Sequence, residues 1–208
     1  MIDIQKVIEK LQNKRKCFVS EADFQLEFAW IIKKLYPEVK VRCEYSYKLN
    51  DKLIHIDVVV IQDNVYYPIE LKYKTKKLDI AIDNEKIYLT NQAAVDQGCY
   101  KFLVDIKRLE NLKEEQEFKY GKGYAIILTN DMNYTRKPRD GSYYESFSLE
   151  EGKTIEGELD WIKGTSEGTK NGCEDSIKLN NKYECRWNFY SSVSNNINGT
   201  FKYMIIEV

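Results

Sequence analysis

Apolar residues spaced three and four positions apart predict two helices at the start of the chain. The first covers residues 3–14, with an apolar stripe formed by Ile4, Val7, Ile8 and Leu11. The second begins at Ser20, because Ser20-Glu21-Ala22-Asp23 is an N-capping sequence, and extends to about Leu35. Pro37 then stops helical growth.

After Pro37 the hydrophobic period changes to two, which predicts three consecutive antiparallel strands. These strands cover residues 39–48, 53–62 and 65–74. A further strand or turn over residues 80–89 leads into a long helix over 91–115, and the apolar run 123–129 is typical of a buried strand. We therefore expect an α/β core over residues 1–130.

Loop-forming residues dominate much of the last third of the chain. Segments 132–144 and 164–175 are rich in Gly, Asn, Asp, Ser and Thr, whereas 183–193 and 201–208 have strand-like patterns. The sequence thus predicts a mostly β extension over residues 131–208, packed on the core in a single compact unit.

Composition removes several kinds of chemistry. The 208 residues include only one histidine, His55, so zinc sites built on paired histidines are excluded. The five cysteines include no Cys-x-x-Cys pair, which argues against a disulfide framework and a zinc ribbon. The net charge of −1 gives no overall attraction to nucleic acid, so such binding needs a local patch. No apolar run reaches the roughly 18 residues that span a membrane, and no signal peptide is evident, so we expect a cytoplasmic protein with no membrane partner.

Two carboxylates occupy opposed positions in the hairpin formed by the second and third predicted strands. Asp63-Asn64 suits a two-residue turn, and that register places Asp57 directly opposite Glu70. Opposed like charges destabilise a strand pair, so something positive should lie between them. Lys72, on the same face, and a hard divalent cation are the candidates. The alternative is that this end of the hairpin is solvated.

These residues also carry a family resemblance. Asp57 followed by Glu70-Leu71-Lys72 at the end of an apolar strand resembles the PD-(D/E)XK signature of restriction-endonuclease-like nucleases. The resemblance covers about residues 21–129 and implies a mixed central sheet flanked by helices. It also implies Mg²⁺, with Mn²⁺ as a substitute, held by Asp57, Glu70 and the Leu71 carbonyl, with Lys72 placing the attacking water.

The resemblance points to further site residues on the flanking helices. Members of the superfamily often carry an acidic residue on the preceding helix, and Glu27 matches it at the edge of an apolar stripe; a structural Glu27 whose hydrogen bonds are satisfied is the alternative. Many relatives also have Gln-x-x-x-Tyr on the following helix. Here Gln92 is followed at that spacing by Asp96, and Tyr100 comes later, so these three are candidate supporting residues or ordinary helix-surface polarity.

The function implied by the resemblance is metal-dependent hydrolysis of DNA phosphodiesters, with restriction in host defence as the suggested role. Lys74, Lys76 and Lys77 are candidate phosphate contacts, although a solvated strand end explains them equally well. The rival hypotheses are an inactive nuclease fold that acts as a nucleic-acid-binding or scaffold module, and an RNA-cleaving nuclease. The sequence leaves homodimerisation open.

Overall fold

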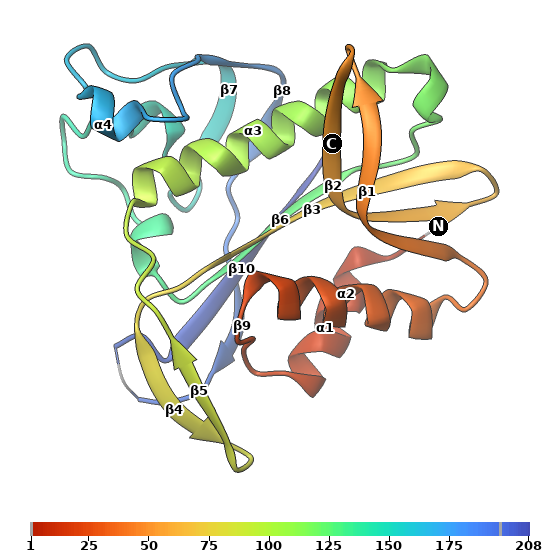
Figure 1. Ribbon diagram of the computed structural model, residues 1–208. Helices are drawn as coiled ribbons and strands as arrows, with labels where there is room; N and C mark the ends of the chain where they lie inside the picture. The colour runs from red at the N-terminus through yellow and green to blue at the C-terminus, as the bar shows by residue number, and fades with distance from the viewer. Residues whose placement is uncertain (1, 196) are drawn as a thin grey trace.

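A six-stranded sheet crosses the molecule and has helices on both faces (Figure 1). The computed structural model describes residues 2–195 and 197–208. In spatial order the strands are β1 (Lys40–Leu49), β2 (Lys52–Gln62), β3 (Val65–Lys74), β6 (Tyr124–Thr129), β10 (Thr200–Glu207) and β9 (Asn188–Ser192). The β3–β6 pair is parallel and the other neighbours are antiparallel, so the predicted mixed α/β architecture is confirmed.

Two hydrophobic clusters hold the helices against the sheet. On one face lie α1 (Ile4–Lys14) and α2 (Glu21–Leu35), and on the other lies α3 (Val95–Glu114) (Figure 1). The short α4 (Glu167–Lys170) belongs to the C-terminal third. Because both faces are covered, every residue of β6 is buried, as its continuous apolar run predicted. No helix among the described residues is long and apolar enough to cross a lipid bilayer.

Two smaller strand pairs complete the fold. The hairpin of β4 (Leu78–Ile82) and β5 (Glu85–Leu89) projects from the body of the molecule directly after β3 (Figure 1). The pair of β7 (Thr154–Leu159) and β8 (Ile177–Glu184) packs beside α3. The predicted strand over 183–193 is in fact divided between β8 and β9, while β9 and β10 extend the central sheet.

The β2–β3 hairpin has the register that its turn predicted. Asp63 and Asn64 both have positive φ, and the pairs run from Gln62↔Val65 to Val58↔Ile69. The ladder ends there, one pair before the predicted juxtaposition of Asp57 and Glu70. The two acids therefore lie at the point where the strands begin to separate, instead of forming a paired rung.

The alternation of faces along β2 also changes at Asp57. Strict alternation places Ile56 and Val58 on the same face, but Ile56 packs in the cluster on the α3 side and Val58 in the cluster with α1 and α2. The neighbouring Glu44 of β1 has φ +51, and the β1–β2 pairs skip from Cys43↔Val58 to Tyr45↔Ile56. This local break in pairing reorients the strand where it carries Asp57.

Candidate functional site

Two carboxylates cap the open edge of β3 beyond its last pair with β2. The backbone N–H of Leu71 donates to Asp57 Oδ2 at 2.6 Å, and the N–H of Tyr73 donates to Glu21 Oε2 at 2.7 Å. Unpaired strand edges expose backbone donors that need partners. Because β2 separates from β3 here, these two N–H groups are free to bind the carboxylates of Asp57 and Glu21, which are thereby held beside β3.

Glu70 is the most deeply buried acid at this place. Its exposed fraction is 1%, and Arg108 Nη1 donates to its Oε1 at 2.8 Å. Its other oxygen, Oε2, has no hydrogen-bond partner among the described residues. Leaving a buried acceptor unsatisfied costs about 1–3 kcal/mol, more when the group is charged. An unsatisfied oxygen of this kind marks a position where a ligand can bind.

The α3 helix supplies both cationic and anionic partners to β3. Lys72 Nζ lies 2.7 Å from Asp105 Oδ2, and Arg108 Nη1 lies 3.4 Å from Asp105 Oδ1. Asp105 and Arg108 are three residues apart and so share one helix face. We call Glu70, Lys72, Asp105 and Arg108 the β3–α3 ion network.

Burial sets the protonation of this network. Desolvation, followed by the charge of Asp105, raises the pKa of Glu70 to about 8, against the opposing effect of Arg108. Burial lowers the pKa of Lys72, but the ion pair with Asp105 outweighs burial and raises it overall. Lys72 is therefore a permanent cation at neutral pH and is not suited to act as a base.

The donor set around Glu70 suits a hard divalent cation. Asp57, Glu70 and the Leu71 carbonyl offer oxygen ligands, the type that Mg²⁺ prefers, and Mg²⁺ usually keeps several waters. Residues 2–195 and 197–208 contain no ready cluster of three or more acidic, His or Cys side chains around one point. The fit thus rests on two carboxylates, one of which has the unsatisfied oxygen Glu70 Oε2, and on one backbone carbonyl.

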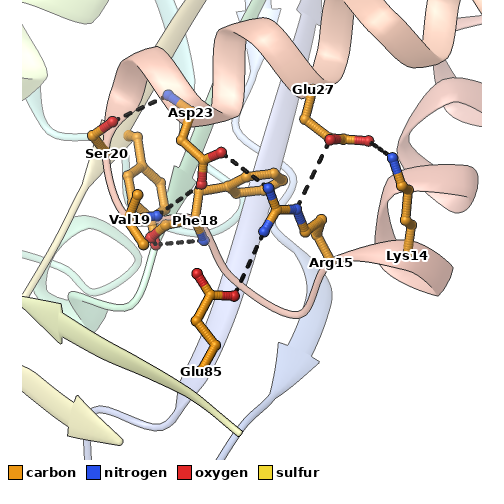
Figure 2. A network of polar contacts seen from close by, with 9 residues as sticks. Lys14, Arg15, Phe18, Val19, Ser20, Asp23, Glu27 and Glu85 are labelled. Carbon is orange, nitrogen blue, oxygen red and sulfur yellow. Dashed lines mark hydrogen bonds and ion pairs between the residues drawn. The ribbon is translucent and has the colours of Figure 1, made fainter. Parts of the chain in front are cut away.

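The predicted helix carboxylate, Glu27, lies elsewhere. Figure 2 shows it between Lys14 and Arg15, and its Oε2 lies 3.9 Å from Arg15 Nε. The face of α2 that meets the strands instead presents Glu21 and, one turn later, Gln25, whose Nε2 donates to the Asp57 carbonyl at 2.6 Å. The structure therefore replaces Glu27 with Glu21 as the helix acid that contacts β3.

The three supporting residues predicted on the following helix are not brought to Glu70. Gln92 is exposed and precedes α3, and its backbone N–H bonds to the Thr75 carbonyl at 2.8 Å. Asp96 accepts a hydrogen bond from the N–H of Gln97. Tyr100 is buried against Phe147 and Trp161. Their contacts are those of an ordinary helix start and core.

The three predicted phosphate-contacting lysines occupy different environments. Lys74 is partly buried and within electrostatic range of Lys72, Lys76 Nζ lies 3.3 Å from Asp131 Oδ2, and Lys77 is exposed. Lys76 is further fixed by Asn130, which bonds to its backbone N–H. Of the three, Lys74 is the one that lies beside the β3–α3 ion network.

In comparisons with known proteins, no family model, no curated protein and no solved structure matches the chain.

Proposed function

We propose that this chain is a metal-dependent nuclease of restriction-endonuclease-like fold, which hydrolyses DNA phosphodiesters where β2 and β3 separate. The observation that carries the proposal is Glu70, a buried carboxylate with one unsatisfied oxygen beside Asp57 and Lys72. The order of elements also supports it. A helix (α2) is followed by three antiparallel strands (β1–β3), a helix (α3) and a strand (β6) that runs parallel to β3.

The chain's own residues have distinct tasks in this reaction. Asp57, Glu70 and the Leu71 carbonyl would hold Mg²⁺, or Mn²⁺ in its place. When bound there, the ion would supply Lewis-acid chemistry, which would polarise the phosphate and stabilise charge on the displaced oxygen. Lys72, a permanent cation, positions a water and a phosphate oxygen by electrostatic attraction. Glu21 keeps the edge of β3 in place and adds negative charge close to the cation site.

Arg108 compensates the negative charge of the β3–α3 ion network. Its guanidinium neutralises Glu70 and Asp105 in the absence of a cation. A buried charge that has lost its partner destabilises the fold. Arg108 therefore stabilises the folded protein when no cation is bound to Glu70. The same pairing favours a second candidate function, a non-catalytic nucleic-acid-binding module in which Arg108 and Lys72 permanently replace the metal.

A cleavage screen separates the two functions. Single- and double-stranded DNA and RNA are incubated with the protein in Mg²⁺, Mn²⁺ or EDTA, and Asp57→Asn is compared with wild type. Asp51→Asn is the matched control, because Asp51 is an exposed acid in the β1–β2 turn. The nuclease predicts metal-dependent cleavage that Asp57→Asn abolishes and Asp51→Asn retains. Nucleic-acid binding that is indifferent to metal, without cleavage, would establish the binding module instead.

A further inference from the structure

A small cavity lies beside the candidate site, between the end of β3 and the start of α3. It has a volume of about 90 Å³, and Lys74, Lys101, Gln92, Gly98 and Tyr134 are among its lining residues. Lys74 follows Lys72 by two residues, so both side chains leave β3 on the same side and about 6.6 Å apart. The cavity is therefore adjacent to the β3–α3 ion network along β3.

The charge that lines this cavity is positive and unpaired. Neither Lys74 nor Lys101 forms an ion pair within the described part of the chain. Burial lowers the pKa of Lys74; nearby Glu21 opposes this effect, whereas the charges of Lys72 and Lys101 add to it. Two unpaired cations facing one hollow repel each other, and an anion between them relieves that repulsion.

Tyr134 adds a directed hydrogen-bond donor to the same cavity. Only 2% of Tyr134 is exposed, and its hydroxyl has no hydrogen-bond partner among the described residues. Burial raises the pKa of Tyr134, so the hydroxyl stays protonated and can donate. A Cβ on Gly98 would lie 2.0 Å from this oxygen, so glycine is required for the ring to reach α3.

We propose that Lys74, Lys101 and the Tyr134 hydroxyl form a binding site for a phosphoryl group of nucleic acid, adjacent to the phosphate that is cleaved. The cavity has room for several water molecules, which suits one tetrahedral oxyanion. This inference rests on the proposed nuclease function for the identity of the ligand. It assigns the second phosphate contact to Lys74, Lys101 and Tyr134, and not to Lys76, which is already paired with Asp131.

The test measures binding without catalysis. Fluorescence anisotropy of a labelled single-stranded DNA is recorded in EDTA, over a series of salt concentrations, for wild type, Lys101→Gln and Tyr134→Phe. Lys113→Gln is the matched control, because Lys113 is an exposed lysine near the other end of α3. Tyr134→Phe removes only an unpartnered oxygen, so its melting temperature should match that of wild type.

We expect Lys101→Gln and Tyr134→Phe each to weaken binding about fivefold to tenfold, and Lys113→Gln less than about twofold. Lys101→Gln should also reduce the slope of log affinity against log salt by about 0.7–1, the signature of one lost phosphate contact. Inorganic phosphate should compete with the DNA for wild type and less effectively for Tyr134→Phe. Oligonucleotides with and without a 5′-phosphate are then compared. If the 5′-phosphate tightens binding only when Tyr134 is intact, the bound group is a terminal phosphate. If the two oligonucleotides bind equally, the bound group is an internal phosphate.

Unchanged affinity and salt slope in both cavity variants would overturn the inference, as would a wild type that binds no DNA in EDTA. The cleavage screen with Asp57→Asn is independent of these results. If the wild type shows metal-dependent cleavage but the cavity variants bind DNA normally, the proposed nuclease function is retained and only the second phosphate site is rejected.

Discussion

Two buried glutamates beside the α3 helix differ in how their charge is compensated. Glu70 of β3 and Glu110 of α3 each expose 1% of their surface. Glu110 accepts hydrogen bonds from the backbone of Asn180 and Asn181 and from the Tyr183 hydroxyl. Burial opposes its charge, but these donors outweigh burial, so its pKa lies below the ordinary value.

Glu70 meets the opposite balance. One side-chain donor, Arg108, reaches one of its oxygens, the other oxygen is unsatisfied, and burial raises its pKa. At equal exposure the two acids therefore have opposite pKa shifts, because Glu110 has more directed donors and the ammonium of Lys107, whereas Glu70 is also repelled by Asp105. Burial with too few donors is the feature on which the proposed role of Glu70 rests.

The largest expected effect concerns cleavage. Glu70→Gln removes a ligand charge at the site, and we expect it to slow metal-dependent cleavage by about 10³-fold or more, equivalent to roughly 4 kcal/mol of transition-state stabilisation. Glu110→Gln, if folded, should retain activity within about threefold. Initial rates on the best substrate from the screen provide the measurement. Similar losses in both variants would remove the functional distinction between the two acids.

Stability should respond in the reverse order. Glu110→Gln withdraws a charged acceptor from several buried donors and should cost about 3 kcal/mol of unfolding free energy at pH 8. Glu70→Gln removes a poorly compensated buried charge, so it should lie within about 1 kcal/mol of wild type or above it at the same pH. Urea denaturation of the three proteins tests this. If Glu70→Gln lost more unfolding free energy than Glu110→Gln, Arg108 would be shown to compensate the charge of Glu70 fully.

The pH dependence of stability sharpens the same contrast. The pKa of Glu70 is about 8 in the folded protein and about 4.3 when unfolded, so the folded state holds an extra proton between these values. Unfolding free energy should therefore fall as pH rises from about 4.5 to about 8, by an amount on the order of a few kcal/mol. Glu70→Gln should flatten this decline, whereas Glu110→Gln should keep it. A Glu70→Gln variant whose unfolding free energy changes with pH across this window as that of wild type does would contradict the raised pKa.

The smallest effect separates two acids of α2. Glu21 contacts the backbone of β3, whereas Glu27 pairs with Lys14 and Arg15. We expect Glu21→Gln to weaken Mn²⁺ binding about tenfold, because a residue that orients a metal site typically contributes ten- to a hundredfold. Glu27→Gln should leave the affinity unchanged. The reverse ranking in a calorimetric titration would restore Glu27 as the site acid.

Local sequence rules predict how the strand residues of the candidate site lie, but not which helix residues lie beside them. The positions of Asp57, Glu70 and Lys72 follow from a turn that only a few residue types adopt, and the Asp63-Asn64 register is confirmed. Glu21 and Glu27 both flank the apolar stripe of α2, and the choice between them depends on how the helix lies across β3. That packing is a tertiary property which periodicity does not contain.

One signal for the ion network was present in the sequence. Asp105 lies within the apolar spacing of Phe102, Ile106 and Leu109, where a carboxylate is buried and requires a partner. Its partners, Lys72 and Arg108, become apparent only when α3 packs on β3. The last third of the chain was harder to predict, because its strands pair with distant β6 and with each other across long loops.

If Asp57 and Glu70 form a cation site, as we propose, calorimetric titration of Mn²⁺ into wild type and Asp57→Asn will detect it. Both titrations are performed at pH 8.5, where Glu70 is largely ionised, with and without a non-cleavable phosphorothioate oligonucleotide. We predict one site that Asp57→Asn eliminates or weakens at least tenfold. Equal binding by both proteins, or no binding by wild type at millimolar Mn²⁺ with the oligonucleotide present, would contradict the account.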